Sequence, residues 1–238
     1  MKVKEACDLQ RAYYTETAEQ YNLMHVSESK DGEHDLACSL LHGLSLHYHI
    51  ESILDIGSGT GRVILNLRDK LPNVRMVGIE PVAALREIGY RNGISRNNLV
   101  EGDATQLKFA NGSFDLVCEC GTLHHIPNPQ SAVAEMLRVA KKAIFISDSN
   151  RFGQGMYAGK LVKLFFYKMK LWPLIDYVKT KGKGYMTSEG DGISYSYSVF
   201  DDYNFIRKHC KTVMIFNLTG SGKCAVTGAG HIGLLGIK

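Results

Sequence analysis

Residues 53–63, with the sequence ILDIGSGTGRV, restrict the fold of this chain more than any other segment. A short apolar run meets three glycines within five residues, and a segment with a helical pattern follows. Glycine permits positive φ angles and lets the backbone approach a ligand closely. A strand, a glycine-rich turn and a helix in this order are typical of the ligand-binding edge of an open parallel α/β sheet.

Strands and helices continue to alternate beyond this segment. We expect strands at 53–56, 75–80, 99–101, 114–118 and 143–147, and helices at 62–71, 82–90 and 129–138. Strands separated by helices of about ten residues predict a parallel sheet that is covered on both faces. Two apolar runs at 213–218 and 232–237, joined by a glycine-rich turn, predict a terminal antiparallel pair of strands.

The two flanks of this pattern define the expected domains. Residues 1–50 look helical and polar, and we interpret them as an N-terminal helical cap on a core at 51–238. The alternation stops after Asp148, so a region at about 150–200 is expected to be an insertion that forms an acceptor site or a lid.

The inserted region is both basic and apolar. Residues 151–184 contain eight Lys or Arg and one acidic residue, a net charge of +7, against +4 for the whole chain. Lys160, Lys163 and Lys170 are expected on one helical stripe. For residues 157–178 three interpretations stay open: a lid over an apolar acceptor, a helix on an anionic membrane surface, and a solvated basic face over an ordinary core contact.

A strict alternation follows in ISYSYSVF, residues 193–200. It predicts a strand with its apolar side chains on one face and the serines on the other. Tyr195 and Tyr197 either line the acceptor pocket or pack at a sheet edge. Asp201 is expected to cap a helix that ends near His209.

Composition excludes several classes of protein. The net charge is too small to indicate nucleic acid by itself. The six cysteines lack the density of a disulfide scaffold and the paired CxxC of a zinc site, which favours a reducing, cytoplasmic environment. The chain shows no apolar signal segment at its start and no apolar run of membrane-spanning length. No metal is expected, because no His/Asp/Glu group has ligand spacing apart from the adjacent His124 and His125.

The glycine loop excludes two common nucleotide sites. Gly57, Gly59 and Gly61 form G-x-G-x-G, whereas a dinucleotide site needs G-x-G-x-x-G, and no G-K-[ST] of a P-loop follows. Asp55, just before the loop, would repel a phosphate; it either helps to hold a cationic ligand or orders the loop. Glu80 ends the next expected strand, where it can accept hydrogen bonds from both hydroxyls of a ribose. The ligand should therefore carry a ribose and an amine but no phosphates.

Four motifs in order resemble the class I S-adenosylmethionine-dependent methyltransferases, and within them the type 11 group of small-molecule enzymes. The motifs are ILDIGSGTG at 53–61, VGIEP at 77–81, VEGDAT at 100–105 and FDLVCECGTLHHIPNP at 114–129. The resemblance covers about residues 13–147. It implies an α/β fold: a Rossmann-like three-layer sandwich around a seven-stranded, mostly parallel sheet with an antiparallel last strand. The family's Gly-Gly turn before the fifth strand is replaced by Lys141-Lys142.

The same resemblance implies the cofactor and its contacts. The cofactor would be S-adenosylmethionine and the product S-adenosylhomocysteine. Glu80 would bind the ribose, Asp103 the adenine amine, and Ala104 would lie against the ring, while Tyr21 or its neighbours would lie near the methionine end. The full set of expected cofactor-binding residues is Tyr21, Asp55, Gly57, Ser58, Gly59, Gly61, Glu80, Pro81, Asp103, Ala104 and Cys120.

His124 and His125 are the expected catalytic residues. They follow the fourth strand, whose carboxyl end should face both cofactor and acceptor. A histidine there can take a proton from a hydroxyl or an amine. The alternative is an architectural role, in which one ring caps the helix after Pro127 or packs under it. We do not choose between the two histidines.

The sequence thus predicts methyl transfer to a small-molecule acceptor, with oxygen favoured over nitrogen, in a sugar or a lipid-linked intermediate. Alignment of the nucleophile with the methyl group and sulfur would supply most of the catalysis. One alternative is an RNA or protein methyltransferase that uses residues 151–184, although no RNA-binding module is visible and no nucleic acid partner is expected. The other is a subunit that binds the cofactor without catalysis. A peripheral membrane contact through 157–178 is a further candidate, and the sequence does not indicate an oligomeric state.

Overall fold

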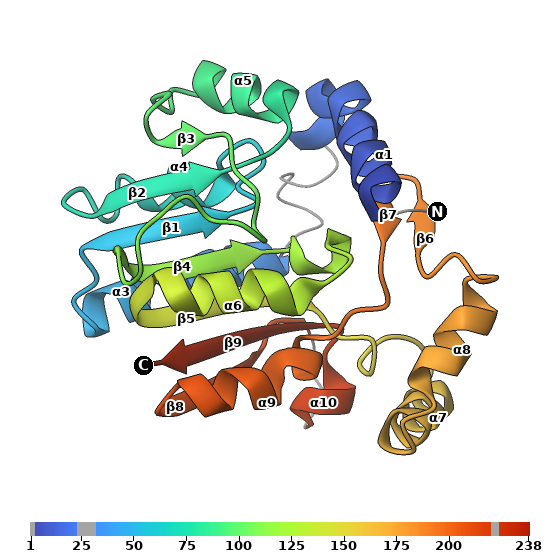
Figure 1. Cartoon of the computed structure of the whole chain (residues 1–238). Coiled ribbons are helices and arrows are strands. Elements are labelled where there is room, and N and C mark those ends of the chain that lie inside the picture. The colour runs from blue at the N-terminus through green and yellow to red at the C-terminus, as the bar shows by residue number, and fades with distance from the viewer. Residues whose placement is uncertain (1–2, 23–31, 220–223) are drawn as a thin grey trace.

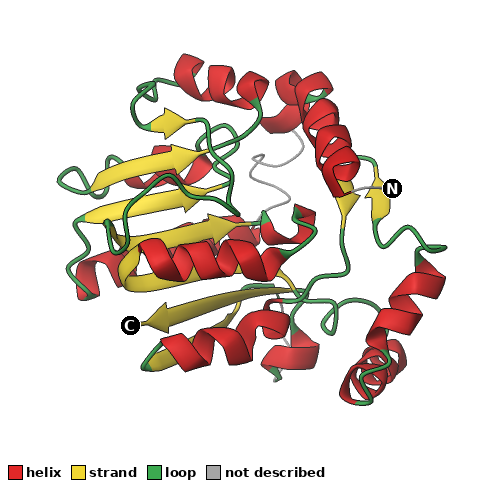
Figure 2. Cartoon of the chain, viewed as in Figure 1, coloured by secondary structure: helices red, strands yellow, loops and turns green. Residues whose placement is uncertain are grey.

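A single seven-stranded sheet organises the described part of the chain (Figure 1, Figure 2). The computed structural model describes residues 3–22, 32–219 and 224–238. The strands are β1 Ser52–Ile56, β2 Arg75–Ile79, β3 Leu99–Val100, β4 Phe114–Cys120, β5 Ala140–Ser149, β8 Thr212–Asn217 and β9 His231–Ile237. Their order is β3-β2-β1-β4-β5-β9-β8, and β9 runs antiparallel to both neighbours while the other pairs are parallel. The expected sheet, with its antiparallel last strand, is confirmed.

Helices cover both faces of the sheet and complete the three expected layers. One cluster of buried apolar residues lies between one face of the sheet and the helices at 32–47 and 62–67. A second cluster lies between the other face and the helices at 129–139 and 199–209. Because both faces are covered, the central strands are mostly apolar on both sides, and every residue of β4 is buried, including the acidic Asp115 and Glu119. The helices are α3 Gly32–His47 and α4 Arg62–Leu67 on one face, α6 Pro129–Val139 and α9 Val199–His209 on the other, and α5 Ala83–Arg91 beside β3.

The segments outside the central sheet meet at one end of it. Figure 1 shows α1 next to a small hairpin of β6 and β7, while α7 and α8 project from the side of the molecule. The Tyr13 hydroxyl accepts a hydrogen bond of 2.7 Å from the Gly190 amide, which ties α1 to the loop of this hairpin. The remaining elements are α1 Val3–Glu16, η1 Ala18–Gln20, η2 Leu123–His125, α7 Tyr157–Lys168, α8 Trp172–Lys179, β6 Met186–Ser188, β7 Gly192–Ser194 and α10 Ala225–Gly228.

The strand predicted at 193–200 is much shorter in the structure. The strand covers only Gly192–Ser194, and α9 begins at Val199, because Ser198 is its N-cap. Asp201 is not the cap itself. It lies at the third helical position, where its carboxylate accepts a 3.1 Å hydrogen bond from the Ser198 amide and completes a capping box. The capping box therefore outweighs the alternating apolar pattern of residues 193–200, and a helix begins where a longer strand was expected.

Two further details differ from the sequence analysis. The helix expected to reach residue 71 ends at Leu67, and residues 68–71 form a tighter turn ahead of Pro72. Lys170 does not share a helical stripe with Lys160, because it lies between α7 and α8 with a φ angle of +58°.

The lysines of α7 do not form the solvated basic face that was one interpretation of the sequence. Lys160 and Lys163 donate hydrogen bonds of 3.0 Å to the backbone oxygens of Thr227 and Arg151, so they turn toward the protein. No residue of α7 or α8 is buried. The picture of a solvated basic face over an ordinary core contact is therefore wrong, since apolar side chains of these helices are exposed. Among the described residues, no helix combines the length and hydropathy needed to cross a bilayer.

We expect Ser198→Ala to lower the free energy of unfolding by about 1–2 kcal/mol. The substitution removes the N-cap of α9 and leaves Asn150 without the buried hydroxyl that donates to its side-chain oxygen at 3.0 Å. Chemical denaturation measures the change, and Ser188→Ala, on the exposed strand β6, is the matched control. Equal unfolding energies for Ser198→Ala and the wild type would contradict the capping role.

Candidate active site

The glycine loop between β1 and α4 needs a bare backbone at Gly59. This residue has a φ angle of +56°, and a Cβ atom there would come within 2.7 Å of the Tyr21 hydroxyl. Its amide donates a 3.0 Å hydrogen bond to Oε2 of Glu80. A side chain at this position would meet both steric and conformational resistance, so the loop can lie this close to its neighbours only with glycine.

Glu80 lies directly after β2 and joins two loops. Its Oε2 atom accepts from Gly59, and its Oε1 atom accepts a 2.9 Å hydrogen bond from the Val82 amide at the start of α5. Burial raises the pKa of this carboxyl to about 7, although both amides favour the ionised form. The group is therefore held in place at the edge of a cavity and titrates near neutral pH.

Asp55, by contrast, faces its own loop. Its Oδ2 atom accepts a 2.6 Å hydrogen bond from the Ser58 hydroxyl, and the carboxyl is almost fully buried. Burial raises its pKa to about 6. Of the two roles left open by the sequence, these contacts correspond to ordering of the loop.

A cavity of about 590 Å³ opens at the carboxyl ends of β1, β2 and β4. Its size is within the usual range for a small-molecule site. The expected site residues that line it are Tyr21, Gly57, Glu80, Pro81, Asp103, Ala104 and His125. Those that do not line it are Asp55, Ser58, Gly59, Gly61, Cys120 and His124. The structure thus brings the ends of the four motifs to one cavity.

Asp103 and Cys120 illustrate the difference between lining and supporting residues. Asp103 lines the cavity, and its Oδ1 atom accepts hydrogen bonds of 2.8 and 2.7 Å from the amide and hydroxyl of Thr105. Cys120 is buried in β4, and its carbonyl accepts a 3.2 Å hydrogen bond from Arg62. Burial raises the pKa of the Cys120 thiol well above its usual value, so this side chain is an uncharged part of the core.

Helix α1 contributes residues to the cavity that the motifs did not identify. Gln10 and Tyr14 both line it. The Gln10 side chain accepts from the Ile193 amide and donates a 3.0 Å hydrogen bond to the Asp191 carbonyl. The first helix is thereby joined to the β6/β7 hairpin directly over the site. Only a contact between the two ends of the chain makes Gln10 significant, and no local pattern signals it.

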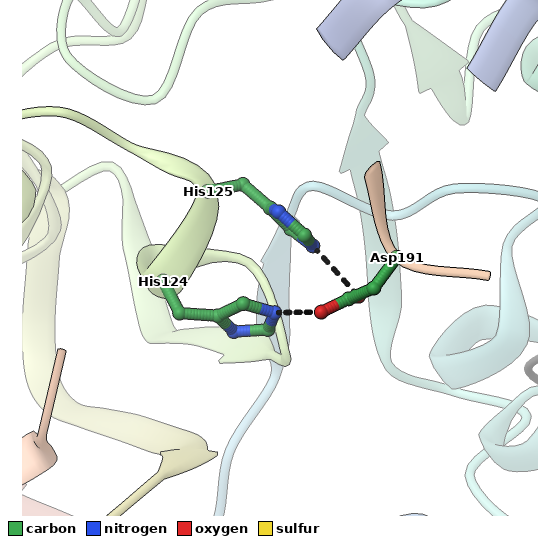
Figure 3. Close-up of side chains that lie close together, drawn as sticks. All are labelled: His124, His125 and Asp191. Carbon is green, nitrogen blue, oxygen red and sulfur yellow. Dashed lines mark ion pairs between the residues drawn. The ribbon is translucent and has the colours of Figure 1, made fainter. Parts of the chain in front are cut away.

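His124 and His125 lie in η2, after β4, and both rings approach Asp191 (Figure 3). Nδ1 of His124 lies 2.7 Å from an oxygen of Asp148, and Nδ1 of His125 lies 2.6 Å from the Ile193 carbonyl. The two Nε2 atoms lie 3.6 and 3.3 Å from the oxygens of Asp191. Nε2 of His125 is also 3.0 Å from the Tyr14 hydroxyl.

The charges of this group are strongly interdependent. Burial alone would lower the pKa of His124, but the Asp148 and Asp191 carboxylates outweigh it and hold that pKa well above its usual value. Burial would raise the pKa of both aspartates, and the neighbouring histidines outweigh it and lower both values. Neither aspartate was predicted from the sequence, because Asp148 lies near the end of β5 outside the motifs and Asp191 lies in a loop far along the chain.

A second cavity of about 260 Å³ lies on the other side of this group. His124 and Asp191 line it, together with Arg151, Lys163 and Trp172. His125 lines the first cavity. The two histidines and Asp191 therefore separate the cavity of the glycine loop from a smaller, basic one.

Comparisons with known proteins agree on one family. Residues 54–146 match a family model described as a methyltransferase domain. This central part of the chain is a methyltransferase domain of the class I, type 11 group. Its cofactor is S-adenosylmethionine. The expected family and cofactor are confirmed.

Two curated relatives share the central part of this methyltransferase. A demethylmenaquinone methyltransferase of Roseiflexus sp. (strain RS-1) is 35% identical over 89 residues, which are 37% of this chain and 37% of that protein. The 2-methyl-6-phytyl-1,4-hydroquinone methyltransferase 1, chloroplastic, of Oryza sativa subsp. japonica is 25% identical over 118 residues, which are 49% of this chain and 36% of that protein. The matched part thus spans little more than a third of either relative.

The fold is shared over a much longer range. The crystal structure of magnesium protoporphyrin IX methyltransferase from Synechocystis PCC 6803, with bound SAH, superimposes with a TM-score of 0.63. The match covers 98% of this chain and 99% of that one, at 11% sequence identity. At such low identity the likeness concerns the fold alone.

We expect binding of S-adenosylmethionine to weaken as the pH falls, because Glu80 lines the cavity and its pKa is about 7. The neutral carboxyl is the poorer acceptor, so a fall from pH 8 to 6.5 should raise Kd roughly fourfold. Asp55, with a pKa of about 6, is still ionised over most of this window. Calorimetric titration at both pH values measures the effect.

The Glu80→Gln methyltransferase should bind S-adenosylmethionine more weakly than the wild type by about 1–3 kcal/mol at pH 8, with little dependence on pH. Glu101→Gln is the control, because the Glu101 side chain is 78% exposed and does not line the cavity. A pH dependence that persists in Glu80→Gln would assign the titration to another group.

Proposed function

We propose that this methyltransferase transfers the methyl group of S-adenosylmethionine to a lipophilic phenol or hydroquinone. The supporting observation is the match of residues 54–146 to a methyltransferase domain whose curated relatives are named for demethylmenaquinone and a phytyl hydroquinone. Of the two kinds of acceptor expected from the sequence, a sugar and a lipid-linked intermediate, this class is closer to the lipid-linked intermediate.

The order of the strands supports the arrangement of the cofactor. Asp103 and Ala104 follow β3, Glu80 follows β2, Gly57 follows β1, and His125 follows β4. Because these strands are consecutive across the sheet, the residues that we propose to contact adenine, ribose and methionine follow one another along the cavity, with the histidines at its end. In this arrangement Tyr21 covers the glycine loop, while Asp55, Ser58, Gly59, Gly61 and Pro81 shape the loops that hold the cofactor.

The acceptor lies at the histidine end in this proposal. A hydroquinone becomes a strong nucleophile when a hydroxyl loses its proton, and the negative charge is then shared by that oxygen and the neighbouring ring carbons. Oxygen stays the favoured methyl acceptor, and a ring carbon is the second outcome. His124 and His125 are assigned to this activation, with Asp191 as part of the same group because both Nε2 atoms approach it.

The two flanks of the core supply the rest of the acceptor site. We assign the cap to residues 1–50 and the acceptor region to about 150–200. The hydrogen bonds between the Gln10 side chain and the backbone of Asp191 and Ile193 support this division, because they join α1 to the hairpin over the cavity.

Cytoplasmic location remains part of the proposal, and all six cysteines, which lie within the described residues, are free.

A lipid-like acceptor also explains the unusual surface of α7 and α8. Exposed fractions reach 84% for Met156, 59% for Phe165, 60% for Leu174 and 69% for Val178. The segment 151–184 carries a net charge of +7. Exposed apolar side chains near the exposed Lys168, Lys170 and Lys179 suit the surface of an anionic membrane, and we propose that the protein takes its acceptor from there.

The decisive experiment is an assay of the purified protein with S-adenosylmethionine and a panel of phenols and hydroquinones with alkyl chains of different length. Mass spectrometry identifies the methylated product and the atom that carries the new methyl group. Formation of S-adenosylhomocysteine with these acceptors supports the proposal. Methylation of RNA or protein substrates instead, or cofactor binding without any turnover, would favour the two alternatives from the sequence.

In the same assay, His125→Ala should lower turnover roughly 100-fold, the usual range for loss of proton transfer or acceptor activation. S-adenosylmethionine affinity should change much less, because the cofactor is held mainly by the loops after β1, β2 and β3. His47→Ala, at the exposed end of α3, is the control. Full activity of His125→Ala would show that this histidine is architectural.

For the membrane contact, we expect the protein to sediment with vesicles that contain anionic phosphatidylglycerol and not with neutral phosphatidylcholine vesicles. Phe165→Glu should weaken this binding by roughly tenfold or more, since it removes an aromatic ring from the apolar surface. Leu46→Glu, at an exposed position on α3, should leave it unchanged. Equal binding of both variants would contradict a contact through α7.

A further inference from the structure

We propose that His124, His125 and Asp191 bind one divalent transition metal ion, with Zn²⁺ as the representative ion, and that this metal activates the acceptor hydroxyl. The inference deepens the proposed function on the acceptor side, while metal binding itself can be tested without it. No metal was expected from the sequence, in which only the two histidines are adjacent. The fold supplies the third ligand from the loop before β7.

The three side chains converge at distances that suit a metal. One ligand atom from each residue lies within 4.8 Å of the others. The Nε2 atoms of His124 and His125 lie 3.6 and 3.3 Å from the two oxygens of Asp191. Ligands of a tetrahedral zinc ion, bound at about 2.1 Å, lie about 3.4 Å from one another. Figure 3 shows both rings directed toward the carboxylate.

The hydrogen bonds behind the rings prepare both Nε2 atoms for this role. Nδ1 of His124 faces the Asp148 carboxylate at 2.7 Å, and Nδ1 of His125 faces the Ile193 carbonyl at 2.6 Å. Both partners only accept hydrogen bonds, so each Nδ1 carries a proton and Nε2 is the nitrogen of each ring that is left to bind a metal ion. Gln10 Nε2 lies farther from the same His125 nitrogen, at 3.2 Å. An Asp–His pair behind a ligating nitrogen is a common support of metal sites.

The carboxylate and the two nitrogens face a common point at which a cation can bind. Two lone pairs directed at a negatively charged group repel it, so either protons or a metal ion must occupy the space. Protons on both rings would place two positive charges side by side, because the ring centroids are only 4.0 Å apart. A metal ion satisfies all three groups with a single charge centre.

The set of ligands selects the kind of metal. Two imidazoles and one carboxylate suit Zn²⁺ and its first-row neighbours, whereas Mg²⁺ and Ca²⁺ prefer oxygen ligands alone. Three protein ligands leave a position for an exogenous molecule, as in catalytic rather than structural sites. The Tyr14 hydroxyl, 3.0 Å from Nε2 of His125, lies close enough to be displaced by the metal or to bond to a ligand in that position.

The loop that carries Asp191 allows entry of an ion. The Asp191 side chain is 40% exposed, whereas Asp148 behind His124 is fully buried. Gly192 holds the backbone at a φ angle of +66°, and a Cβ atom there would lie 2.6 Å from Oε1 of Gln10. The aspartate is thus fixed beside both histidines by a tight turn that contacts α1.

The chemistry at this position is a proton loss followed by methyl transfer. The acceptor hydroxyl binds the metal through oxygen, which lowers its pKa, and the O–H bond breaks with the proton passing to water. An electron pair on the phenolate oxygen forms the bond to the methyl carbon. The carbon–sulfur bond breaks as this bond forms, and its electron pair returns to sulfur, which gives neutral S-adenosylhomocysteine. If a ring carbon supplies the electron pair instead, that carbon then loses its own hydrogen as a proton to water, and the ring becomes aromatic again.

Titration of chelator-treated, tag-free protein with Co²⁺ tests the metal site directly. We expect one equivalent to bind, with visible absorption bands of a four- or five-coordinate ion and displacement by Zn²⁺. Asp191→Asn should weaken binding more than the 10- to 100-fold expected for Asp148→Asn, which only removes a supporting group. Asp191 is the safer variant, because loss of the fully buried Asp148 leaves a buried His124 without its partner.

Glu189→Gln is the matched control, since Glu189 is an exposed acid in the same loop and should leave Co²⁺ binding unchanged. Absence of the absorption bands in the wild type, or equal affinity in Asp191→Asn and Glu189→Gln, would overturn the inference. S-adenosylmethionine binding is measured on the same samples. Cofactor binding and turnover without any metal would refute this site alone, whereas failure to bind the cofactor would refute the proposed function.

Discussion

The Glu80 carboxylate connects the parts of the sheet edge on which the rest of the site depends. Through Gly59 it fixes the loop after β1, and through Val82 it fixes the start of α5 after β2. Burial makes this carboxyl costly to ionise in spite of the two amides and the nearby Arg86, and its pKa rises to about 7. In the proposed function, the ribose hydroxyls of the cofactor would donate further hydrogen bonds to this carboxylate.

A second connection closes the same site from outside the core. Gln10 on α1 joins the backbone of Asp191 and Ile193, and Tyr13 accepts from Gly190. The hairpin of β6 and β7 lies next to α1 because of these contacts, although 181 positions separate Gln10 from Asp191 in the sequence (Figure 1). The acceptor end is consequently assembled from three regions: η2 after β4, the loop before β7, and the first helix.

These two connections explain what sequence reasoning could and could not predict. The strands and helices of the core carry strong local signals, namely apolar runs, glycines at tight turns and Pro at the start of α6, so their order and direction were predictable. The presence of Glu80, Asp103 and Ala104 in the cavity wall was also predictable, because each follows a strand within a motif. Asp191 and Gln10 were not, since their importance arises only when distant segments meet. The strand expected at 193–200 failed because the Ser198 cap outweighed an alternation of apolar residues.

The position of the histidines relates the cofactor to the rest of the molecule. His125 lines the larger cavity, while His124 and Asp191 line the smaller, basic one toward α7 and α8. An acceptor that reaches the histidines from the side of α7 and α8 would meet Arg151, Lys163 and Trp172 on its way. In-line transfer requires the nucleophile, the methyl carbon and the sulfur in one line, so in the proposed function the acceptor hydroxyl must extend past the histidines into the larger cavity. The exposed apolar helices, the basic cavity and the histidine group mark the route that we propose for the acceptor.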